Sequence, residues 1–462
     1  MDYQSPGVFV EETPVLASAV AGVSTAIPAF IGYTAQAGPG DSLYYKPTRI
    51  TTLADYENLF GKAEEKITVE VSGDTVDSVT FPATIKNTYY GMQMFFNNGG
   101  ESCYIVAIDE NDTTKSAVEK FTAAVNTLKL EDEPTLIVLV DGVNMPLITI
   151  PDDPTTPEDE TDEVSAYYSI YDLVLQQCNT MKDRFAIFDV IDTGNPDADA
   201  EEFRKYLTDN NLRYGAAYYP YLNTTLNYQY SDSSVTVNGA ADTNVKKLGD
   251  IDHKTKLYNN IVEALKGYFV TLPPSSAVAG VYASVDRNRG VWKAPANVSL
   301  ASVIGPKVKL TEEQDGTFNV DAASGKSINA IRSFTGKGTL IWGARTLAGN
   351  DNEWRYVPIR RLFNYVEESI QKATAFAVFE PNTSMTWLKL RSMVESFLDN
   401  LWRQGALAGG KAEDAYFVQV GLGTTMTSQD ILEGRLIIKV GLAAVRPAEF
   451  IILQFTHKLQ TS

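Results

Sequence analysis

The chain has 462 residues, of which 44% are hydrophobic and 21% charged, and its formal net charge is −19. This length suits two or three domains with real cores, and the negative charge argues against nucleic-acid binding, which needs a basic surface. No apolar run approaches the roughly 18 residues of a membrane span. The start of the chain also lacks the pattern of a signal peptide, so we expect a soluble protein without direct membrane insertion.

The first predicted element is a short apolar strand near the start of the chain. Pro6-Gly7 precedes the run Val8-Phe9-Val10-Glu11, Thr13-Pro14 ends it, and a tether of small residues follows. β-Branched and aromatic residues bounded by Pro and Gly are typical of strands. A strand without a neighbour in its own vicinity leaves its N–H and C=O groups unpaired and tends to pair with another chain. We therefore predict that this arm adds to a sheet of a neighbouring subunit.

Strands and helices then alternate along the chain. After a strand at Ala26–Tyr33 we predict a helix at Thr51–Phe60 with Thr52 as its N-cap, and then a hairpin of Ile67–Val71 and Ser78–Phe81. The elements that follow are helix Asn87–Asn97, strand Cys103–Ile108, helix Ser116–Leu128, strand Thr135–Val140, helix Ala166–Lys182, strand Arg184–Val190, helix Ala198–Asn210 and strand Tyr214–Tyr219. This alternation predicts βαβ units and a mainly parallel sheet that is covered on both faces.

The helical pattern stops after Tyr219 and returns only in part. Tyr228 to Val237 predicts a second exposed hairpin that ends at Asn238-Gly239, and Pro273-Pro274 is expected to start an extended passage with Gly280, Gly290 and Pro295. The other predicted elements are helix Leu257–Lys266, strand and turn Arg332–Leu347, helices Arg360–Phe376 and Met385–Trp402, and strands Ala415–Val420, Arg435–Val445 and Glu449–Thr456.

The last predicted strand has the same character as the first, because Pro447 precedes another apolar run. A four- or five-residue added strand forms a few hydrogen bonds of about 0.5–1.5 kcal/mol each, whereas ordering its backbone costs about 1–2 kcal/mol per residue. One exchanged arm is therefore weak, and many arms in an array are strong. The residues predicted for strand exchange are Val8, Phe9, Val10, Glu11, Leu436, Ile438, Val440, Phe450, Ile452 and Phe455.

Little in the sequence indicates catalysis. The two histidines, His253 and His457, show no metal-ligand spacing, and there is no G-x-S-x-G motif. The stretch 405–411 matches most of a phosphate-binding loop, but Ala412 replaces the required Ser/Thr and a helix precedes it. Gly325-Lys326-Ser327 matches the last three residues of that motif, but Val320 stands where its first glycine is required. We expect no catalytic residue, no metal and no cofactor.

Two further features have ordinary explanations. The acidic stretch 152–163 is interrupted by prolines and lacks the ligand spacing of a calcium loop, so we expect a solvated loop. Cys103 and Cys178 fall in segments predicted to be a buried strand and helix. We therefore expect both thiols to be reduced.

Ten segments of the chain carry a resemblance to a known protein family. They are SPGVFVEE (5–12), GVSTAIPAFIGYT (22–34), SLYYKPTRITTLADYENLFG (42–61), FFNNGGESCYIVAI (95–108), DRFAIFDV (183–190), NLRYGAAYYPYL (211–222), PPSSAVAGVYASVDRNRGVWKAPANV (273–298), GKSINAIRSFTGKGTLIWGARTLAGNDNEWRYVPIRRLFNYVEESIQKAT (325–374), LWRQGALAGGK (401–411) and EGRLIIKVGLAAVRPAEFIILQF (433–455). In these segments the chain resembles contractile tail sheath proteins, and the resemblance covers nearly the whole chain in order. The departures are two insert-like stretches, Ala63–Thr84 and Gln229–Lys247.

The resemblance implies a structural subunit that polymerises helically around an inner tube. The sheath would contract from a metastable extended state and drive the tube through a target envelope. The implied partners are the chain itself, the inner tube protein, and baseplate and terminal cap proteins, with room for a paralogous sheath subunit. The resemblance also implies assembly in the bacterial cytoplasm, either as a phage tail or as a phage-tail-like injection particle that is released.

The implied architecture is a mixed α/β fold in which both termini build an inner sheath domain and the middle of the chain builds an outer one. The predicted parts are the arm 1–25, an α/β portion 26–110 with insert 63–84, an outer part 111–344 with insert 229–247, and the inner domain 345–462. The candidate contacts to the tube are Lys389, Arg391, Arg403 and Lys411. Two alternatives stay open at this point: an α/β enzyme with a defined pocket, and a monomeric binding domain whose ends fold back on their own sheet.

Overall fold

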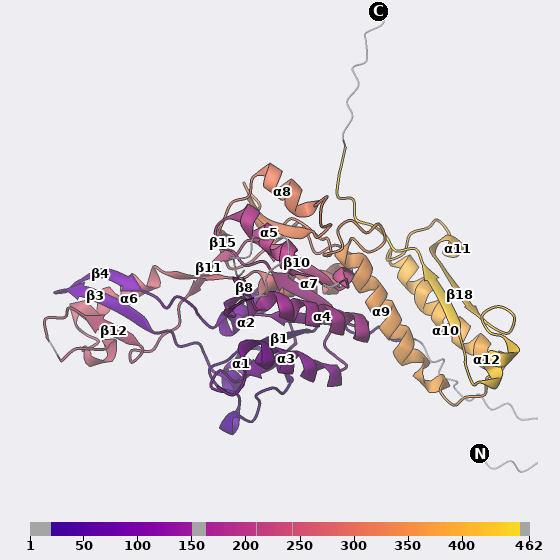
Figure 1. The fold of residues 1–462 in the computed structure, drawn as a ribbon, viewed down its shortest axis with the longest axis horizontal. Coiled ribbons are helices and arrows are strands. Elements are labelled where there is room, and N and C mark those ends of the chain that lie inside the picture. The colour runs from indigo at the N-terminus through magenta and orange to yellow at the C-terminus, as the bar shows by residue number, and fades with distance from the viewer. Residues whose placement is uncertain (1–19, 150–162, 209, 243, 453–462) are drawn as a thin grey trace, which may run out of the picture. The chain divides into compact units, whose positions relative to one another are not determined.

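A computed structural model describes residues 20–149, 163–208, 210–242 and 244–452. These residues form two compact units. The larger unit holds the described residues of 24–365 together with 446–452, and the smaller unit holds 20–23 and 366–445. Figure 1 shows the elements of both units along the chain.

A large sheet organises the larger unit. Among the described residues it has nine strands, in the order β14-β17-β16-β10-β9-β6-β1-β5-β2. The six strands from β16 to β5 are parallel, whereas β2, β17 and β14 pair antiparallel at the two ends. The bounds are β1 Pro28–Tyr33, β2 Thr48–Ile50, β5 Cys103–Ile108, β6 Leu136–Leu139, β9 Phe185–Asp189, β10 Gly215–Tyr219, β14 Val298–Ser299, β16 Ile328–Phe334 and β17 Gly338–Ile341. The predicted mainly parallel sheet is confirmed.

Each central strand supplies side chains alternately to two cores, as expected for a sheet that is covered on both faces. In β1, Ala29 and Ile31 belong to one core and Phe30 belongs to the other. The first core also contains residues of α3 (Ala117–Thr127), α4 (Tyr167–Met181) and α5 (Pro196–Tyr206). The second contains residues of α1 (Leu53–Phe60), α2 (Asn87–Asn97) and α7 (Ser275–Arg289).

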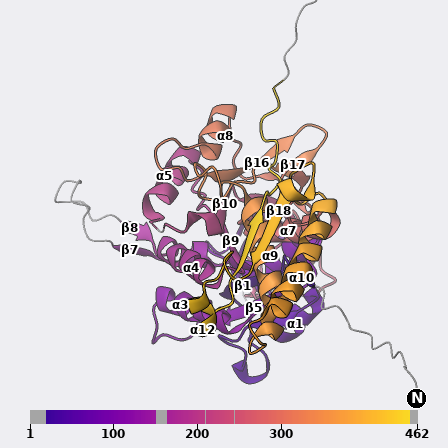
Figure 2. The same ribbon diagram turned by 90° about the vertical axis from the view of Figure 1, so that its right-hand side faces the viewer.

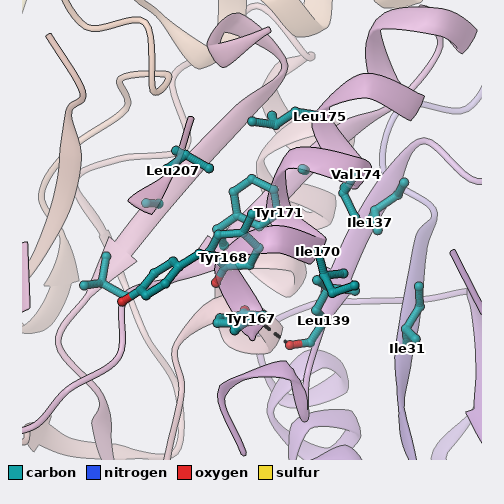
Figure 3. Close-up of a cluster of buried hydrophobic side chains, with 14 of the residues drawn as sticks. Ile31, Ile137, Leu139, Tyr167, Tyr168, Ile170, Tyr171, Val174, Leu175 and Leu207 are labelled. Atoms are coloured by element: carbon teal, nitrogen blue, oxygen red, sulfur yellow. Dashed lines mark hydrogen bonds between the residues drawn. The ribbon is translucent and has the colours of Figure 1, made fainter. Parts of the chain in front are cut away.

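The first core is rich in aromatic rings. Tyr171 of α4 stacks on Phe188 of β9 with ring centroids 3.7 Å apart. In Figure 3 the hydroxyl of Tyr167 points to the backbone carbonyl of Leu139 at 3.5 Å. Burial of such rings is a large source of stability, and it accounts for part of the high tyrosine content of the chain.

The two insert-like stretches of the sequence meet in one lobe of the larger unit (Figure 1). β3 (Ile67–Ser72) and β4 (Thr75–Thr80) form the predicted hairpin, and β12 (Val235–Asn238) pairs parallel with β3. α6 (Lys256–Lys266) shares their core. The second predicted hairpin, within 228–237, is wrong: β12 pairs with β3, a strand about 170 residues earlier, and its local contact is a single antiparallel bridge between Thr236 and Lys247.

α7 corrects the predicted extended passage after Pro273-Pro274. The helix is buried over most of its length, so it shows no polar stripe and gives no amphipathic signal. Its small residues allow a close approach to α2, since a Cβ at Gly280 would lie 2.5 Å from the carbonyl oxygen of Phe95. The glycine that suggested a loop is therefore a packing residue.

The remaining elements of the larger unit are mostly short. Four of them were not predicted: β11 (Leu222–Asn227), β13 (Phe269–Leu272) and β15 (Val303–Pro306), which form a three-stranded sheet, and α8 (Glu312–Asn319). β7 (Leu147–Thr149) and β8 (Glu163–Ser165) pair antiparallel. α9 (Val357–Thr374) begins in the larger unit and ends in the smaller one.

The smaller unit contains a long helix and a two-stranded sheet. α10 (Ser384–Arg403) precedes α11 (Ala412–Ala415) and β18 (Tyr416–Val420), and α12 (Ser428–Leu432) precedes β19 (Ile438–Leu442). β19 is shorter than the predicted strand Arg435–Val445. The predicted strand Glu449–Thr456 shows no strand pairing over its described residues 449–452.

Candidate assembly site

The sheet of β18 and β19 offers unpaired strand edges. The two strands are antiparallel, with Phe417 opposite Gly441 and Val418 opposite Val440. In the part of the chain that the structure describes, no third strand joins this sheet, so each strand keeps one edge without a strand partner. Both ends of β19 are tied to nearby loops: the Ala408 N–H donates to the Ala443 carbonyl at 2.7 Å beyond the strand, and the Thr425 hydroxyl donates to the Ile437 carbonyl at 2.7 Å before it. Such edges accept added strands.

α10 supports this sheet from one side. Figure 2 shows β18 running alongside α10, and Val418 of β18 is buried. The buried side chains of the helix recur every three or four residues and form one apolar stripe. They are Leu390, Met393, Val394, Phe397, Leu398 and Leu401. The helix therefore gives the open sheet a rigid backing.

Phe417 lies on the exposed side of the sheet, where its side chain is 53% exposed. Its ring occupies the space above Gly441, since a Cβ added at Gly441 would lie 2.1 Å from the ring. The absent side chain at Gly441 thus allows Phe417 to lie flat across β19. An apolar ring held in this way next to two open edges is suited to contact an incoming strand.

An exposed apolar segment follows β19. After the chain returns to the larger unit at Arg446, Phe450, Ile451 and Ile452 are 69%, 79% and 81% exposed. These three residues have no strand partner among the described residues. The chain thus carries open sheet edges in one unit and an unpaired apolar segment in the other.

The residues predicted for strand exchange fall into three groups: those in or near β19, those in the exposed segment 450–452, and those outside the described residues. Ile438 and Val440 lie in β19, whereas Leu436 lies in the loop before it, and the exchange of all three between subunits stays a prediction. Phe450 and Ile452 lie in the exposed segment. The arm residues Val8, Phe9, Val10 and Glu11, together with Phe455, lie outside the described residues. Their exchange between subunits stays a prediction.

The candidate tube contacts lie in the smaller unit. Lys389, Arg391 and Arg403 are on α10, and all three are exposed. Nε of Arg391 lies 2.7 Å from Oε1 of Glu395, and Nε of Arg403 lies 2.8 Å from Oδ2 of Asp399, which are ordinary pairs at i, i+4. Nζ of Lys389 lies 4.5 Å from the ring centroid of Phe376. Lys411, also exposed, precedes α11. Their role at a tube stays a prediction.

In α/β enzymes, ligands bind at the C-terminal ends of the parallel strands. In this chain the side chains of two aspartates occupy that position, at the N-termini of α2 and α7. Asp141, after β6, accepts hydrogen bonds from the Asn87 N–H at 2.6 Å and the Thr88 hydroxyl at 2.6 Å, at the start of α2. Asp189, at the end of β9, accepts from the Ser275 N–H at 2.8 Å and its hydroxyl at 2.6 Å, at the start of α7. The donors that would bind a phosphate are thus already engaged.

Both carboxylates are fully buried, and the sequence analysis did not identify either. Burial raises the pKa of Asp141 to about 6 and that of Asp189 to about 7, against the lowering effect of the hydrogen bonds that each accepts. The available signal was an aspartate at the end of each of two apolar strands. The roles of these residues become visible only when the topology brings α2 and α7 to them.

The motifs that resembled a phosphate-binding loop have structural roles. Gly405 comes directly after Gln404, the C-cap of α10, and has φ 84°, a left-handed conformation that glycine favours. Nζ of Lys326 donates to the carbonyls of Arg204 and Leu207, both at 2.5 Å, and so caps the end of α5. The described ranges contain no cluster of three residues that could hold a metal ion. Cys103 and Cys178 are buried free thiols.

None of the helices in the described ranges combines the length and the apolar character that crossing a membrane requires.

Comparison with known proteins gives a consistent family. Residues 349–458 match the model of the phage tail sheath C-terminal domain. The sheath of PVC, an extracellular contractile injection system, in its contracted state is 33% identical, over 99% of both chains, with a TM-score of 0.65. The chain belongs to the contractile sheath protein family. This confirms the predicted family, the mixed α/β fold and the structural sheath role.

Two other relatives define the extent of the similarity. The contracted helical sheath of the anti-feeding prophage (AFP) is 31% identical over 99% of this chain and 100% of that one, with a TM-score of 0.66. The tail sheath protein of Vibrio phage KVP40 is 24% identical over 136 residues, which are 29% of this chain and 20% of that protein. The segments matched in the curated phage sheaths cover 19% to 40% of those proteins. The match to injection-system sheaths therefore extends over far more of both chains.

Proposed function

We propose that this sheath subunit polymerises into a helical lattice around an inner tube and contracts from a metastable extended state to drive the tube through a target envelope. The observation that carries the proposal is that one chain combines the open sheet β18–β19 with the exposed apolar segment 450–452. The similarity to the PVC and AFP sheaths over 99% of the chain supports it.

Strand exchange supplies the connection between subunits in this proposal. The N-terminal arm of one subunit, around Val8–Glu11, would add as a strand beside 435–442, which contains β19, or beside the segment 450–455 of another subunit. Hydrogen bonds of about 0.5–1.5 kcal/mol each do not outweigh an ordering cost of about 1–2 kcal/mol per residue. Burial of side chains such as Phe450 and Ile452, at about 25 cal/mol per Å², must make the exchange favourable. Repetition through the lattice then makes it strong.

Contraction in this scheme needs no hydrolysis. The contracted lattice would be favoured because it buries more surface per subunit, and a trigger would shift the population from the extended state to the contracted one. The engaged helix N-termini at Asp141 and Asp189 fit a sheet that serves as a scaffold and binds no nucleotide. This supports a structural role over an α/β enzyme.

The proposed partners are further copies of the chain, the inner tube, and baseplate and cap proteins. AFP relatives occur in sheath and baseplate complexes, which supports self-assembly and a baseplate contact. Assembly would take place in the bacterial cytoplasm, followed by incorporation into a phage tail or an injection particle. A paralogous subunit could share the lattice.

Removal of residues 1–15 tests the exchange. We expect a folded, soluble subunit that sediments as a monomer, under conditions in which the full chain forms tubes. The larger core stays intact because the deletion ends before β1 at Pro28. Circular dichroism of the truncated chain controls for misfolding. Normal tubes from the truncated chain would contradict the role of the arm.

A further inference from the structure

The exposed segment 450–452 begins next to a buried charged contact. Glu449, the residue before Phe450, receives two hydrogen bonds from Arg345: Nε to Oε1 at 2.8 Å and Nη2 to Oε2 at 2.6 Å. Nδ2 of Asn319 donates to Oε1 at 2.6 Å, and the Tyr356 hydroxyl donates to Oε2 at 3.1 Å. We call these four residues the tail anchor. A paired, bidentate guanidinium contact of this kind fixes both position and orientation.

The tail anchor is largely shielded from water. The side chains of Arg345 and Glu449 are 4% and 20% exposed. Burial by itself would raise the pKa of Glu449, but the hydrogen bonds from Arg345 and Asn319 and the Arg345 charge lower it. A second contact lies three residues earlier, where Nη1 of Arg446 donates to the Asn352 carbonyl at 2.8 Å. The chain is therefore held at both ends of 446–449.

A similar buried arginine contact holds the chain just before β1, on the N-terminal side. Arg361 of α9 pairs with Asp286 of α7, with Nη1 3.0 Å from Oδ1, and its Nη2 donates to the Thr25 carbonyl at 2.8 Å. The side chains of the pair are 3% and 5% exposed. Thr25 lies just before β1, where the N-terminal arm joins the sheet. We call this contact the arm anchor.

Each terminal segment is thus joined to the rest of the larger unit at a point held by a buried arginine. We propose that the two anchors transmit the pull of the exchanged arms to the large sheet, so that movement of one subunit is passed to its neighbours. This inference rests on the proposed sheath function. A freed stretch of four residues, 446–449, spans at most about 14 Å when it is fully extended, so its release can lengthen the connection by only part of that distance. Release of the tail anchor would therefore give each connection slack without cutting it.

The substitution Glu449→Gln tests the tail anchor, because it keeps the size of the side chain and removes its charge. The control is Asp315→Asn, which removes a carboxylate 2.7 Å from Arg332 in a pair that involves neither terminal segment. The side chains of that pair are 22% and 18% exposed, which matches the partial burial of Glu449.

The first measurement is cleavage of the unassembled subunit by chymotrypsin after Phe450. A protease needs several residues in extended form, so it must open the anchor. We expect Glu449→Gln to be cleaved about tenfold faster or more, because hydrogen bonds to a charged group are the stronger ones. Asp315→Asn should be cleaved at the parent rate. Equal rates for Glu449→Gln and the parent would overturn the tail anchor.

The second measurement is made on assembled particles. Glu449→Gln should form tubes as the parent does, but after a chemical trigger most of its tubes should stay long or shorten only in part. Full shortening, or no tubes from a normally folded subunit, would overturn transmission by the anchor. A parent chain that forms no tubes would instead overturn the proposed sheath function, and the cleavage assay would still test the anchor.

The arm anchor needs a milder change, because removal of Arg361 would leave Asp286 buried without its partner. Arg361→Lys keeps the charge opposite Asp286 but has one nitrogen in place of the two that contact Asp286 and Thr25. We expect an unchanged fold by circular dichroism, faster hydrogen exchange at the start of β1, and incomplete shortening after the trigger. Exchange and shortening equal to those of the parent would remove the arm anchor from the proposal.

Discussion

Asp141 and Asp189 predict an unusual pH dependence of stability. In the folded chain their pKa values are raised to about 6 and about 7, from an ordinary value of 3.8, because burial disfavours the charged form. The folded state therefore binds these protons more tightly than the unfolded state does. By linkage, the contribution of the two groups is most favourable below pH 3.8, decreases as the pH rises, and is constant above about pH 7. We therefore expect the free energy of unfolding of the subunit to increase as the pH is lowered from 8 to 5.

The size of the effect follows from these pKa values. A difference of one unit corresponds to about 1.4 kcal/mol. Only part of each titration falls between pH 8 and pH 5. Over that range the free energy of unfolding should increase by about 3 kcal/mol through Asp189 and by about 1 kcal/mol through Asp141. Groups whose pKa is lowered act in the opposite direction, but at lower pH: for Asp430 the folded value is about 2. Between pH 8 and pH 5 the stability therefore responds to the carboxylates whose pKa is raised, and not to those whose pKa is lowered.

Urea unfolding of the unassembled subunit at several pH values tests this. Asp189→Asn should flatten the increase by about 3 kcal/mol and Asp141→Asn by about 1 kcal/mol, since an amide does not titrate. Asp74→Asn, at a side chain that is 55% exposed, is the control and should leave the parent curve unchanged. A parent whose stability is flat or falls from pH 8 to pH 5, or an Asp189→Asn variant with the parent slope, would refute this role of the buried carboxylates.

Three further changes address assembly. Gly441→Val should displace the ring of Phe417, lower the stability of the smaller unit by about 1 kcal/mol and reduce tube formation more than folding; equal tube yields by sedimentation would contradict this. Two or three residues added between Glu12 and Val23 should lock the sheath in its extended form while assembly survives, because the loop-entropy cost is well below about 1 kcal/mol; shortening equal to the parent's after a trigger would exclude the coupling. Charge reversal at Arg403 and Lys411 together should give contracted, empty sheaths by electron microscopy; sheaths that enclose a tube as often as the parent place the contact elsewhere.

Local signals predicted much of the large sheet. α2 has the predicted bounds, Asn87–Asn97, because its apolar pattern ends at Gly99-Gly100. α1 begins after Thr52, whose side chain accepts from the Asp55 N–H as an N-cap. Such elements carry their own start and stop signals, so a reading of the sequence in short windows is sufficient for them.

The errors arise where distant residues decide the structure. α7 was missed because a helix buried on most sides shows no polar stripe. The pairing of β12 with β3, a strand far away in the sequence, leaves no local trace, so the sequence predicts a hairpin within 228–237 in its place. The tail anchor could not be predicted for the same reason, since Arg345 and Glu449 are more than 100 residues apart. The open edges of β18 and β19 could not be predicted either, because an edge is open only if no other strand of the fold pairs with it.

The most direct test of the central claim is the length of native assemblies before and after a trigger. Purified particles should appear by negative-stain electron microscopy as striated tubes of two lengths, and the trigger should convert the long form into a shorter and wider one around a protruding inner tube. The subunit composition should stay the same in both forms. Particles that remain monomeric, or tubes of one fixed length that the trigger does not change, would contradict a contractile sheath.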